Sequence, residues 1–258
     1  MANDILKSMG RSLSAVGINA RALLSLRHAQ RYFRQARRFR RQGGQITHRY
    51  PILTDYDDSA GAASGHYFHQ DLLVASLVHT ANPARHIDVG SRIDGFVAHI
   101  AAFRKIEVLD IRPLADTGHD NTRFLRADLM DRTIELPRAD SVSCLHAIEH
   151  FGLGRYGDPV EPDGHRRGLG NLLRMVEPGG SLYLSFPIGR RNEVHFNAHR
   201  VFHPRDVFEW ARAAPLSLLR FDYVDDVGRL HRRADPLQDL AVDYGCGIYT
   251  FRVGHAAS

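Results

Sequence analysis

The chain has 258 residues, of which 43% are hydrophobic and 24% charged, and its formal net charge is +5. This composition is ordinary for a globular protein and suffices for one large domain with an appendage. Residues 1–43 contain ten of the 34 Lys and Arg residues and one of the 29 acidic residues, which leaves 24 basic against 28 acidic residues for the rest. Because the main body is mildly acidic, we expect no nucleic-acid partner, and we assign the basic charge to an N-terminal arm.

The two cysteines, Cys144 and Cys246, lie in different apolar runs and cannot make a disulfide framework. No apolar run reaches the roughly 18–20 residues that cross a bilayer, and no signal-peptide pattern is found. We therefore expect a cytoplasmic protein, with peripheral contact to the inner membrane as an option that depends on the arm.

The arm, residues 1–44, is predicted to be helical over residues 4–42. Apolar residues recur every three or four positions from Ile5 to Leu23, and Arg-rich turns with Tyr32, Phe33 and Phe39 follow. Two interpretations stay open. The arm is either a solvated helix pair that packs on the domain or on a second subunit as a homo-oligomer, or a basic amphipathic helix that contacts an anionic membrane surface.

Residues 45–258 alternate between predicted strands and helices after a linker at 45–65, as a doubly wound α/β domain requires. We expect a Rossmann-like, seven-stranded sheet that is mostly parallel, with the last strand antiparallel and helices on both faces. The predicted strands are 86–90, 106–111, 122–129, 141–148, 181–187, 216–224 and 247–253. The predicted helices are 65–80, 95–103, 169–176 and 206–213.

Acidic residues end three consecutive predicted strands. The turn between Asp88 and Gly90 brings backbone N–H groups to the carboxyl edge of the sheet, where a helix start can hold a polar or anionic ligand group. Asp110 lies about 20 residues after Gly90, where a carboxylate accepts hydrogen bonds from the ribose hydroxyls of a nucleotide. Asp128 can accept from an adenine amino group. Together these acids predict an adenosine-containing ligand.

Several motifs resemble class I S-adenosylmethionine-dependent methyltransferases over residues 66–254. They are Asp88-Val-Gly90-Ser91, Leu109-Asp110, Ala127-Asp128-Leu129, His146-Ala-Ile-Glu149-His150 and Val176-Glu-Pro-Gly179-Gly180. The resemblance implies S-adenosyl-L-methionine as the cofactor. With the strand-end pattern, it predicts that the cofactor is bound by Asp88, Gly90, Ser91, Arg92, Asp110, Ile111, Asp128, Leu129 and His146.

More narrowly, residues 65–71, 86–96 and 196–200 look like a bacterial family of unknown function. That family is associated with surface-polysaccharide biosynthesis and is presumed to methylate sugars. The resemblance implies a saccharide or sugar nucleotide as the methyl acceptor.

The glycine turn departs from the superfamily pattern, because Arg92 and Asp94 stand where glycines are usual and Gly95 comes one step late. The Arg92 side chain either blocks the methionine part of the cofactor or pairs with its carboxylate. If it blocks the cofactor, the domain is a catalytically inactive binding or scaffold domain.

The loop after the fifth predicted strand, residues 189–200, should face the same cavity, because ligands bind at the carboxyl ends of parallel strands. Its arginines and histidines suit an anionic small-molecule or glycan substrate, since a guanidinium matches a carboxylate or phosphate. The alternative for Arg190 and Arg191 is a solvated surface pair. The predicted substrate-binding residues are Arg190, Arg191, His195, Asn197 and Arg200.

A sulfonium methyl donor is already activated, so the protein has only to position the acceptor and take its proton. A neutral imidazole is the natural base for a sugar hydroxyl. His150 is the first candidate and His199 the second, while a purely structural His150 is the alternative. A metal held by His195, His199 and an acid would be another route, but we expect no metal site, and the His66-x-x-His69 pair has no adjacent third ligand.

These features predict a cytoplasmic O-methyltransferase that acts on a saccharide or sugar nucleotide in bacterial cell-surface polysaccharide biosynthesis. The alternative is a catalytically inactive methyltransferase-like domain that binds or scaffolds partners. A nucleic-acid methyltransferase is disfavoured, because His146-Ala-Ile-Glu149 offers no aromatic stack for a flipped base.

Overall fold

The structure, a computed structural model, describes residues 20–58, 60–61, 63–131, 133–212 and 214–254. The chain divides into two compact units, residues 1–62 and 63–258, each of which is considered by itself. Of the helical segment predicted over residues 4–42, residues 4–19 lie outside the described residues.

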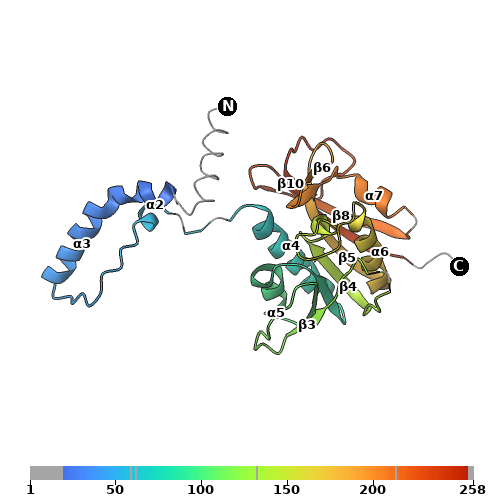
Figure 1. Ribbon diagram of the computed structural model, residues 1–258, viewed down its shortest axis with the longest axis horizontal. Helices are drawn as coiled ribbons and strands as arrows, with labels where there is room; N and C mark the ends of the chain where they lie inside the picture. Colours follow the sequence, from blue (N-terminus) through green and yellow to red (C-terminus); the bar gives the residue numbers. More distant parts are fainter. Residues whose placement is uncertain (1–19, 59, 62, 132, 213, 255–258) are drawn as a thin grey trace. The chain divides into compact units, whose positions relative to one another are not determined.

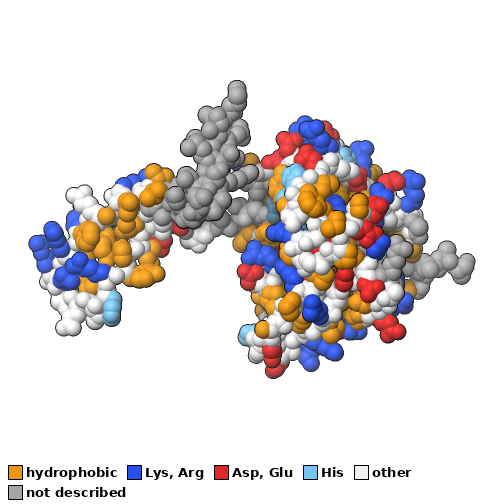
Figure 2. All heavy atoms as spheres, in the orientation of Figure 1, with side chains coloured by type: hydrophobic (Ala, Val, Ile, Leu, Met, Phe, Trp, Pro, Cys, Tyr) orange, Lys and Arg blue, Asp and Glu red, His pale blue; other side chains and the backbone are white. Residues whose placement is uncertain are grey.

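The described part of the first unit is helical up to Arg41. It consists of α2 (Ala20–Ser25), η1 (Leu26–His28) and α3 (Ala29–Arg41), followed by the short turn η2 (Thr54–Asp57). Asp57 accepts hydrogen bonds from Arg27 and His28, so η2 folds back against the helices. Arginine and hydrophobic side chains are both exposed on this unit, as Figure 2 shows. What the unit contacts remains a prediction.

The second unit is built on one eight-stranded sheet with the strand order β3-β2-β1-β4-β5-β10-β8-β9 (Figure 1). The first five of these strands are mutually parallel, and β10 runs antiparallel to both of its neighbours. This arrangement confirms the predicted α/β fold with a mostly parallel sheet. The strands are β1 (His86–Val89), β2 (Ile106–Asp110), β3 (Thr122–Arg126), β4 (Ala139–Leu145), β5 (Val176–Ile188), β8 (Leu216–Val224), β9 (Leu230–His231) and β10 (Gly245–Val253).

The predicted count of seven strands is wrong, because a tight turn after β8 returns the chain as β9. Asp225 Oδ1 accepts hydrogen bonds from the N–H groups of Val227 and Arg229, and Gly228 supplies a positive φ of 82°. A strand of two residues is too short to show any alternation in the sequence. A separate hairpin, β6 (Glu193–His195) and β7 (His199–Val201), forms where we predicted only a loop.

Helices cover both faces of the sheet. The helices are α4 (His66–Ala81), η3 (Ile93–Val97), α5 (Ala98–Ala101), η4 (Ile148–His150), α6 (Gly164–Met175) and α7 (Asp206–Trp210). One buried cluster joins α4, η3 and α5 to the sheet, and the other joins α6 and α7 to its opposite face. Figure 1 shows these two groups of helices on either side of the strands.

Helix α6 begins five residues before the predicted start at 169. Its first turns contain Gly164 and Gly168, which lower helix propensity and hid the start from the sequence pattern. Both glycines are needed for packing. A Cβ at Gly168 would lie 2.3 Å from the ring of Phe151.

In the part of the chain that the structure describes, the helices lack the combination of length and apolar character needed to span a membrane.

Candidate active site

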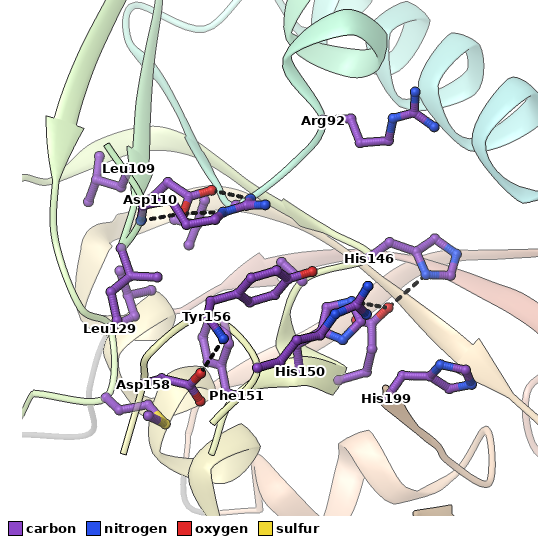
Figure 3. A pocket seen from close by; sticks show the side chains of 18 of the residues that line it. Arg92, Leu109, Asp110, Leu129, His146, His150, Phe151, Tyr156, Asp158 and His199 are labelled. Carbon is purple, nitrogen blue, oxygen red and sulfur yellow. Dashed lines mark hydrogen bonds and ion pairs between the residues drawn. The ribbon is translucent and has the colours of Figure 1, made fainter. Parts of the chain in front are cut away.

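A cavity of about 260 Å³ opens at the carboxyl ends of β1, β2 and β4 (Figure 3). This is the edge of a doubly wound sheet at which ligands are expected to bind. Its wall brings together many of the predicted residues, namely Gly90, Arg92, Asp110, Ile111, Asp128, Leu129, His146, His150 and His199.

The turn after β1 requires the glycine at position 90. Gly90 has a φ of 71°, and a Cβ there would lie 2.8 Å from the Cβ of Ala147. Asp88 is fully buried and accepts hydrogen bonds from Ser91 Oγ at 2.6 Å and Ser143 Oγ at 2.5 Å. Burial raises the pKa of Asp88 to about 6. Asp88 and Ser91 are not part of the described cavity wall; instead, they fix the shape of the turn.

The side chain of Arg92 pairs with a carboxylate at the rim. Its Nη2 lies 2.7 Å from Asp94 Oδ2, and its guanidinium carbon lies 5.0 Å from the centre of the Tyr67 ring. In Figure 3 it extends away from Asp110. Gly95, which comes one position later than in the usual pattern, is also explained by packing, since a Cβ there would lie 2.4 Å from Asp71 Oδ2. Arg92 therefore does not fill the space between the turn and Asp110.

The acids after β2 and β3 have local partners. Asp110 accepts from Arg112 through the backbone N–H at 2.8 Å and through the guanidinium, whose Nη2 lies 2.6 Å from Oδ2. Asp128 Oδ1 accepts from the Met130 N–H at 2.8 Å. A carboxylate has about four lone-pair sites, so both acids retain capacity for ligand hydroxyl or amino groups.

A buried pair lies on the opposite wall, just after β4. His146 Nδ1 lies 2.8 Å from Glu149 Oε1. Burial opposes the charged form of His146, but Cys246 and Glu149 outweigh it and raise the pKa of His146 well above its usual value. Burial likewise opposes the ionised form of Glu149, but the neighbouring His146 outweighs it, so the pKa of Glu149 is lowered. The two side chains thus form a buried ion pair.

His150 is held in one tautomer. Its Nδ1 lies 2.7 Å from the carbonyl oxygen of Ala198, so Nδ1 carries the proton and Nε2 keeps its lone pair. Burial lowers the pKa of His150, and burial also lowers the pKa of His199. Both imidazoles are therefore neutral near pH 7, as a general base requires.

Three buried polar atoms of the cavity wall have no hydrogen-bond partner among the described residues. They are His146 Nε2, Glu149 Oε2 and His199 Nε2. Buried polar groups are nearly always paired in native proteins, so unpaired ones in a cavity are typical of a ligand site.

The predicted substrate-binding residues do not lie on the described cavity wall. Arg190 and Arg191 precede β6, His195 ends β6, and all three side chains are exposed. Arg190 pairs with Asp243 at 3.0 Å, and Arg191 and His195 pair with Glu193. The side chain of Asn197 is also exposed.

Arg200 points in the opposite direction, into the protein. It is 4% exposed, and its guanidinium donates to the carbonyl oxygens of Phe151 at 2.6 Å and Pro162 at 3.1 Å. These contacts tie β7 to the segment after η4 and leave Arg200 without access to the cavity.

Sequence reasoning missed several wall residues that come from distant segments. Aromatic and basic side chains dominate this group, which consists of His66, Tyr67, Arg112, Glu149, Arg155, Tyr156 and Tyr244. Glu149 carried a usable signal, because it directly precedes His150 after a predicted strand. The other residues show no spacing that could have identified them.

Comparison with known proteins supports the fold. N-methyltransferase NodS from Bradyrhizobium japonicum WM9, crystallised with S-adenosyl-L-homocysteine, is 12% identical with a TM-score of 0.50, over 80% of this chain and 94% of that chain. An S-adenosylmethionine-dependent methyltransferase from Clostridium acetobutylicum ATCC 824 is 10% identical with a TM-score of 0.50, over 79% and 95%. The [4+2]-cyclase SpnF is 18% identical with a TM-score of 0.53, over 83% and 90%.

Sequence comparison adds one match. The family described as "Caenorhabditis protein of unknown function, DUF268" matches residues 131–209, which is less than half of the chain. No curated protein matches the chain. The chain therefore has the fold of class I S-adenosylmethionine-dependent methyltransferases, whereas its link to surface polysaccharides stays a prediction.

Proposed function

We propose that the protein is an S-adenosyl-L-methionine-dependent O-methyltransferase that acts on a saccharide or sugar nucleotide in bacterial cell-surface polysaccharide biosynthesis. The observation that carries the proposal is the division of the cavity: carboxylates suited to a nucleoside lie on one wall, and the neutral imidazole of His150 lies on the other. Its Nε2 makes no hydrogen bond to the residues that the structure describes and lies 3.8 Å from Glu149 Oε1.

The cofactor would bind with its adenosine part toward β2 and β3. Asp110 retains about one lone-pair site for a ribose hydroxyl beside its three hydrogen bonds from Arg112, and Asp128 has lone pairs for the adenine amino group. Ile111 and Leu129 supply apolar surface for the adenine ring. The methionine part would extend along the Gly90 turn toward His146, with Arg92 at the rim available to its carboxylate.

Proton transfer would fall to His150. Its Nε2 carries the lone pair, and the hydrogen bond from Nδ1 to Ala198 prevents the ring from turning. A hydroxyl group of the acceptor would donate to Nε2 while its oxygen attacks the methyl group. His199, on the same wall and also neutral, is the second candidate.

An anionic acceptor is supported by a different arginine from those predicted. Arg155 lies on the cavity wall, donates to the carbonyl oxygen of Ala198 at 2.9 Å, and has no carboxylate partner among the described residues. It could bind a phosphate or carboxylate of a sugar nucleotide. The saccharide itself rests on the family resemblance of the sequence.

A catalytically inactive binding domain is the second candidate. Arg112 already donates three hydrogen bonds to Asp110, the carboxylate that the ribose would need. The structural neighbours also have different activities and include a cyclase, so the fold alone does not determine the reaction.

Calorimetry with S-adenosyl-L-methionine separates the two candidates. The enzyme requires saturable binding by the wild-type chain. Asp110→Ala should weaken binding by about 10- to 100-fold through the loss of hydrogen bonds to a charged group. Asp116→Ala, an exposed acid in the next loop, is the matched control and should bind normally.

No binding by the wild type at high micromolar cofactor would reject the enzyme. Equal binding by wild type and Asp110→Ala would reject the position of the ribose. If binding is normal but no nucleoside-diphosphate sugar is methylated, the saccharide acceptor is wrong and the cofactor site stands.

We also propose that the protein works in the cytoplasm, and that its basic N-terminal arm contacts either an anionic inner-membrane surface or a second subunit. The exposed Arg residues and the exposed Leu23, Phe33 and Phe39 of the first unit support such a contact. Sedimentation of the full chain with phosphatidylglycerol vesicles, compared with phosphatidylcholine vesicles, tests the membrane form. Sedimentation equilibrium without vesicles tests self-association.

A further inference from the structure

We propose that His66, His146 and Cys246 form a binding site for one divalent transition-metal ion of the zinc class, open toward the cavity. These three side chains could bind a metal whether or not the protein transfers methyl groups.

The three side chains offer donor atoms at close range. One nitrogen from each histidine and the Cys246 sulfur all lie within 4.8 Å of one another. Tetrahedral zinc with ligands at about 2.0–2.3 Å holds its donor atoms about 3.5 Å apart, so binding requires an approach of about 1.3 Å at most. The ring centroids of His66 and His146 are 5.3 Å apart, close to the roughly 5 Å expected for two imidazoles on one tetrahedral ion, but the rings are stacked with only 10° between their planes. Because a metal ion lies in the plane of each imidazole that binds it, binding also requires one of the rings to rotate.

His146 is oriented as a metal ligand. Its side chain is 6% exposed, and its Nδ1 is paired with Glu149 Oε1 at 2.8 Å. Its Nε2 is buried and lacks a hydrogen-bond partner among the described residues. Metal-bound histidines characteristically donate their second ring N–H to a carboxylate, which fixes the ring and raises its basicity. Glu149 would play that part.

Rigid elements hold the three groups. His66 begins α4, His146 directly follows β4, and Cys246 lies in β10. Cys246 is fully buried, and its sulfur lies 3.6 Å from Gln70 Oε1 on the same helix as His66. We expected no metal because His66 has no third ligand near it in the sequence, whereas the fold supplies two ligands from residues far along the chain.

The ligand set indicates the metal and the direction of the open position. One thiolate and two imidazoles suit zinc and similar borderline ions better than magnesium or calcium. His66 and His146 line the cavity, while Cys246 lies behind them. Three protein ligands leave a fourth position, which would face the cavity and take water or an oxygen of a bound molecule.

Cobalt titration tests the site. The full-length chain is freed of metal with a chelator and titrated with Co²⁺ alone while absorption is recorded. We expect one equivalent to produce a thiolate-to-cobalt charge-transfer band and the strong visible bands of four-coordinate cobalt, and Zn²⁺ to abolish both. Cys246→Ser should lose the charge-transfer band. Cys144→Ser, which removes the other buried cysteine, should keep it.

His66 provides a second test that does not alter the core. His66→Ala should weaken Co²⁺ binding by about 100-fold or more, because even outer-shell changes cost about 10- to 100-fold. His69→Ala, one turn further along α4, is its control and should bind as the wild type. If Cys246→Ser does not fold, the comparison of His66→Ala with His69→Ala decides whether the site exists.

The proposal is overturned if the wild type gives no charge-transfer band, if Cys246→Ser retains it, or if His66→Ala binds Co²⁺ as tightly as His69→Ala.

Discussion

The two walls of the cavity are built in different ways. On the β2–β3 wall, Asp110 and Asp128 are bonded to residues two positions further along the chain. On the β4–β10 wall, His146 and Glu149 lie close to residues from distant segments, namely His66 of α4, Arg200 of β7 and Cys246 of β10. Buried polar atoms of this wall have no hydrogen-bond partner among the residues that the structure describes.

We interpret this difference as a division of roles, in which the β2–β3 wall binds a ligand and the β4–β10 wall carries the chemistry. Local hydrogen bonds satisfy part of each carboxylate and hold it in place, which suits the repeated binding of a nucleoside. Unpaired buried atoms are costly to the fold, by about 1–3 kcal/mol each. A protein retains them where a ligand completes them, so the β4–β10 wall is where a reaction or a metal ion is to be expected.

Removing the imidazole of His150 should have the largest effect. We expect His150→Ala to lower the rate of methyl transfer to nucleoside-diphosphate sugars by about 100- to 10 000-fold, because general-base catalysis contributes that much. Cofactor affinity, measured by calorimetry, should not change. His195→Ala, an exposed histidine outside the cavity wall, is the control.

The pH dependence sharpens the assignment. Burial lowers the pKa of His150 below its ordinary value of 6.5. The base form therefore persists at pH 7, and the rate should fall only as the pH drops below 6.5. If His199→Ala abolishes activity while His150→Ala does not, the base is His199.

A substitution of Arg200 tests whether this arginine binds substrate, as the sequence predicted, or stabilises the fold through its hydrogen bonds to buried carbonyl groups. Arg200→Ala should lower the free energy of unfolding by about 3 kcal/mol, because hydrogen bonds to a charged group are worth about 1.5–3 kcal/mol each and their loss leaves buried carbonyl groups unpaired. Urea denaturation measures this loss. The exposed Arg191→Ala should change stability by less than about 0.5 kcal/mol. A stable Arg200→Ala variant that binds acceptor poorly would restore the substrate-binding prediction.

The sequence was most informative where structure depends on neighbours in the chain. The runs that became β1, β2 and β4 are short, largely buried and rich in apolar residues, and the turn or proline signals that follow them helped to identify them. The Gly90 turn and the position of Asp110 at a strand end also follow from local patterns.

It was least informative where long-range pairing decides which way a side chain faces. Arg200 and Arg191 look equivalent in the sequence, but Arg200 lies in β7 and donates inward to the carbonyl groups of Phe151 and Pro162, whereas Arg191 precedes β6 and is exposed. The grouping of His66 with His146 and Cys246 depends on strand β10 entering between β5 and β8, and no spacing in the chain reports that.

Glu149→Gln weakens the β4–β10 wall while keeping its shape. Glutamine still accepts a hydrogen bond from His146 but carries no charge, so we expect a loss of about 1–2 kcal/mol in the free energy of unfolding. The contribution of Glu149, whose pKa is lowered, is present above its ordinary 4.5 and is lost as the pH falls through the folded-state value. That of His146, whose pKa is raised, is fully present below 6.5 and is lost as the pH rises through the folded-state value.

In the metal-free protein, the difference between wild type and Glu149→Gln should therefore be largest between pH 4.5 and 6.5 and shrink on either side. Urea denaturation across this range measures it. Glu209→Gln, an exposed acid on α7, should show no such maximum. A difference that does not vary with pH would mean that the pair is not ionised in the folded protein.

Arg112 should give the smallest effect, and it tests the β2–β3 wall directly. The ion pair between Arg112 and Asp110 is partly exposed, and such pairs are worth about 0–1 kcal/mol. If Arg112 competes with the cofactor ribose, Arg112→Gln should tighten binding of S-adenosyl-L-methionine by up to about fivefold. Arg123→Gln, at an exposed residue of neighbouring β3, is the calorimetric control and should leave affinity unchanged. If Arg112→Gln weakens binding instead, Arg112 holds Asp110 in place for the ribose, and the local pairing of this wall belongs to the binding site rather than opposing it.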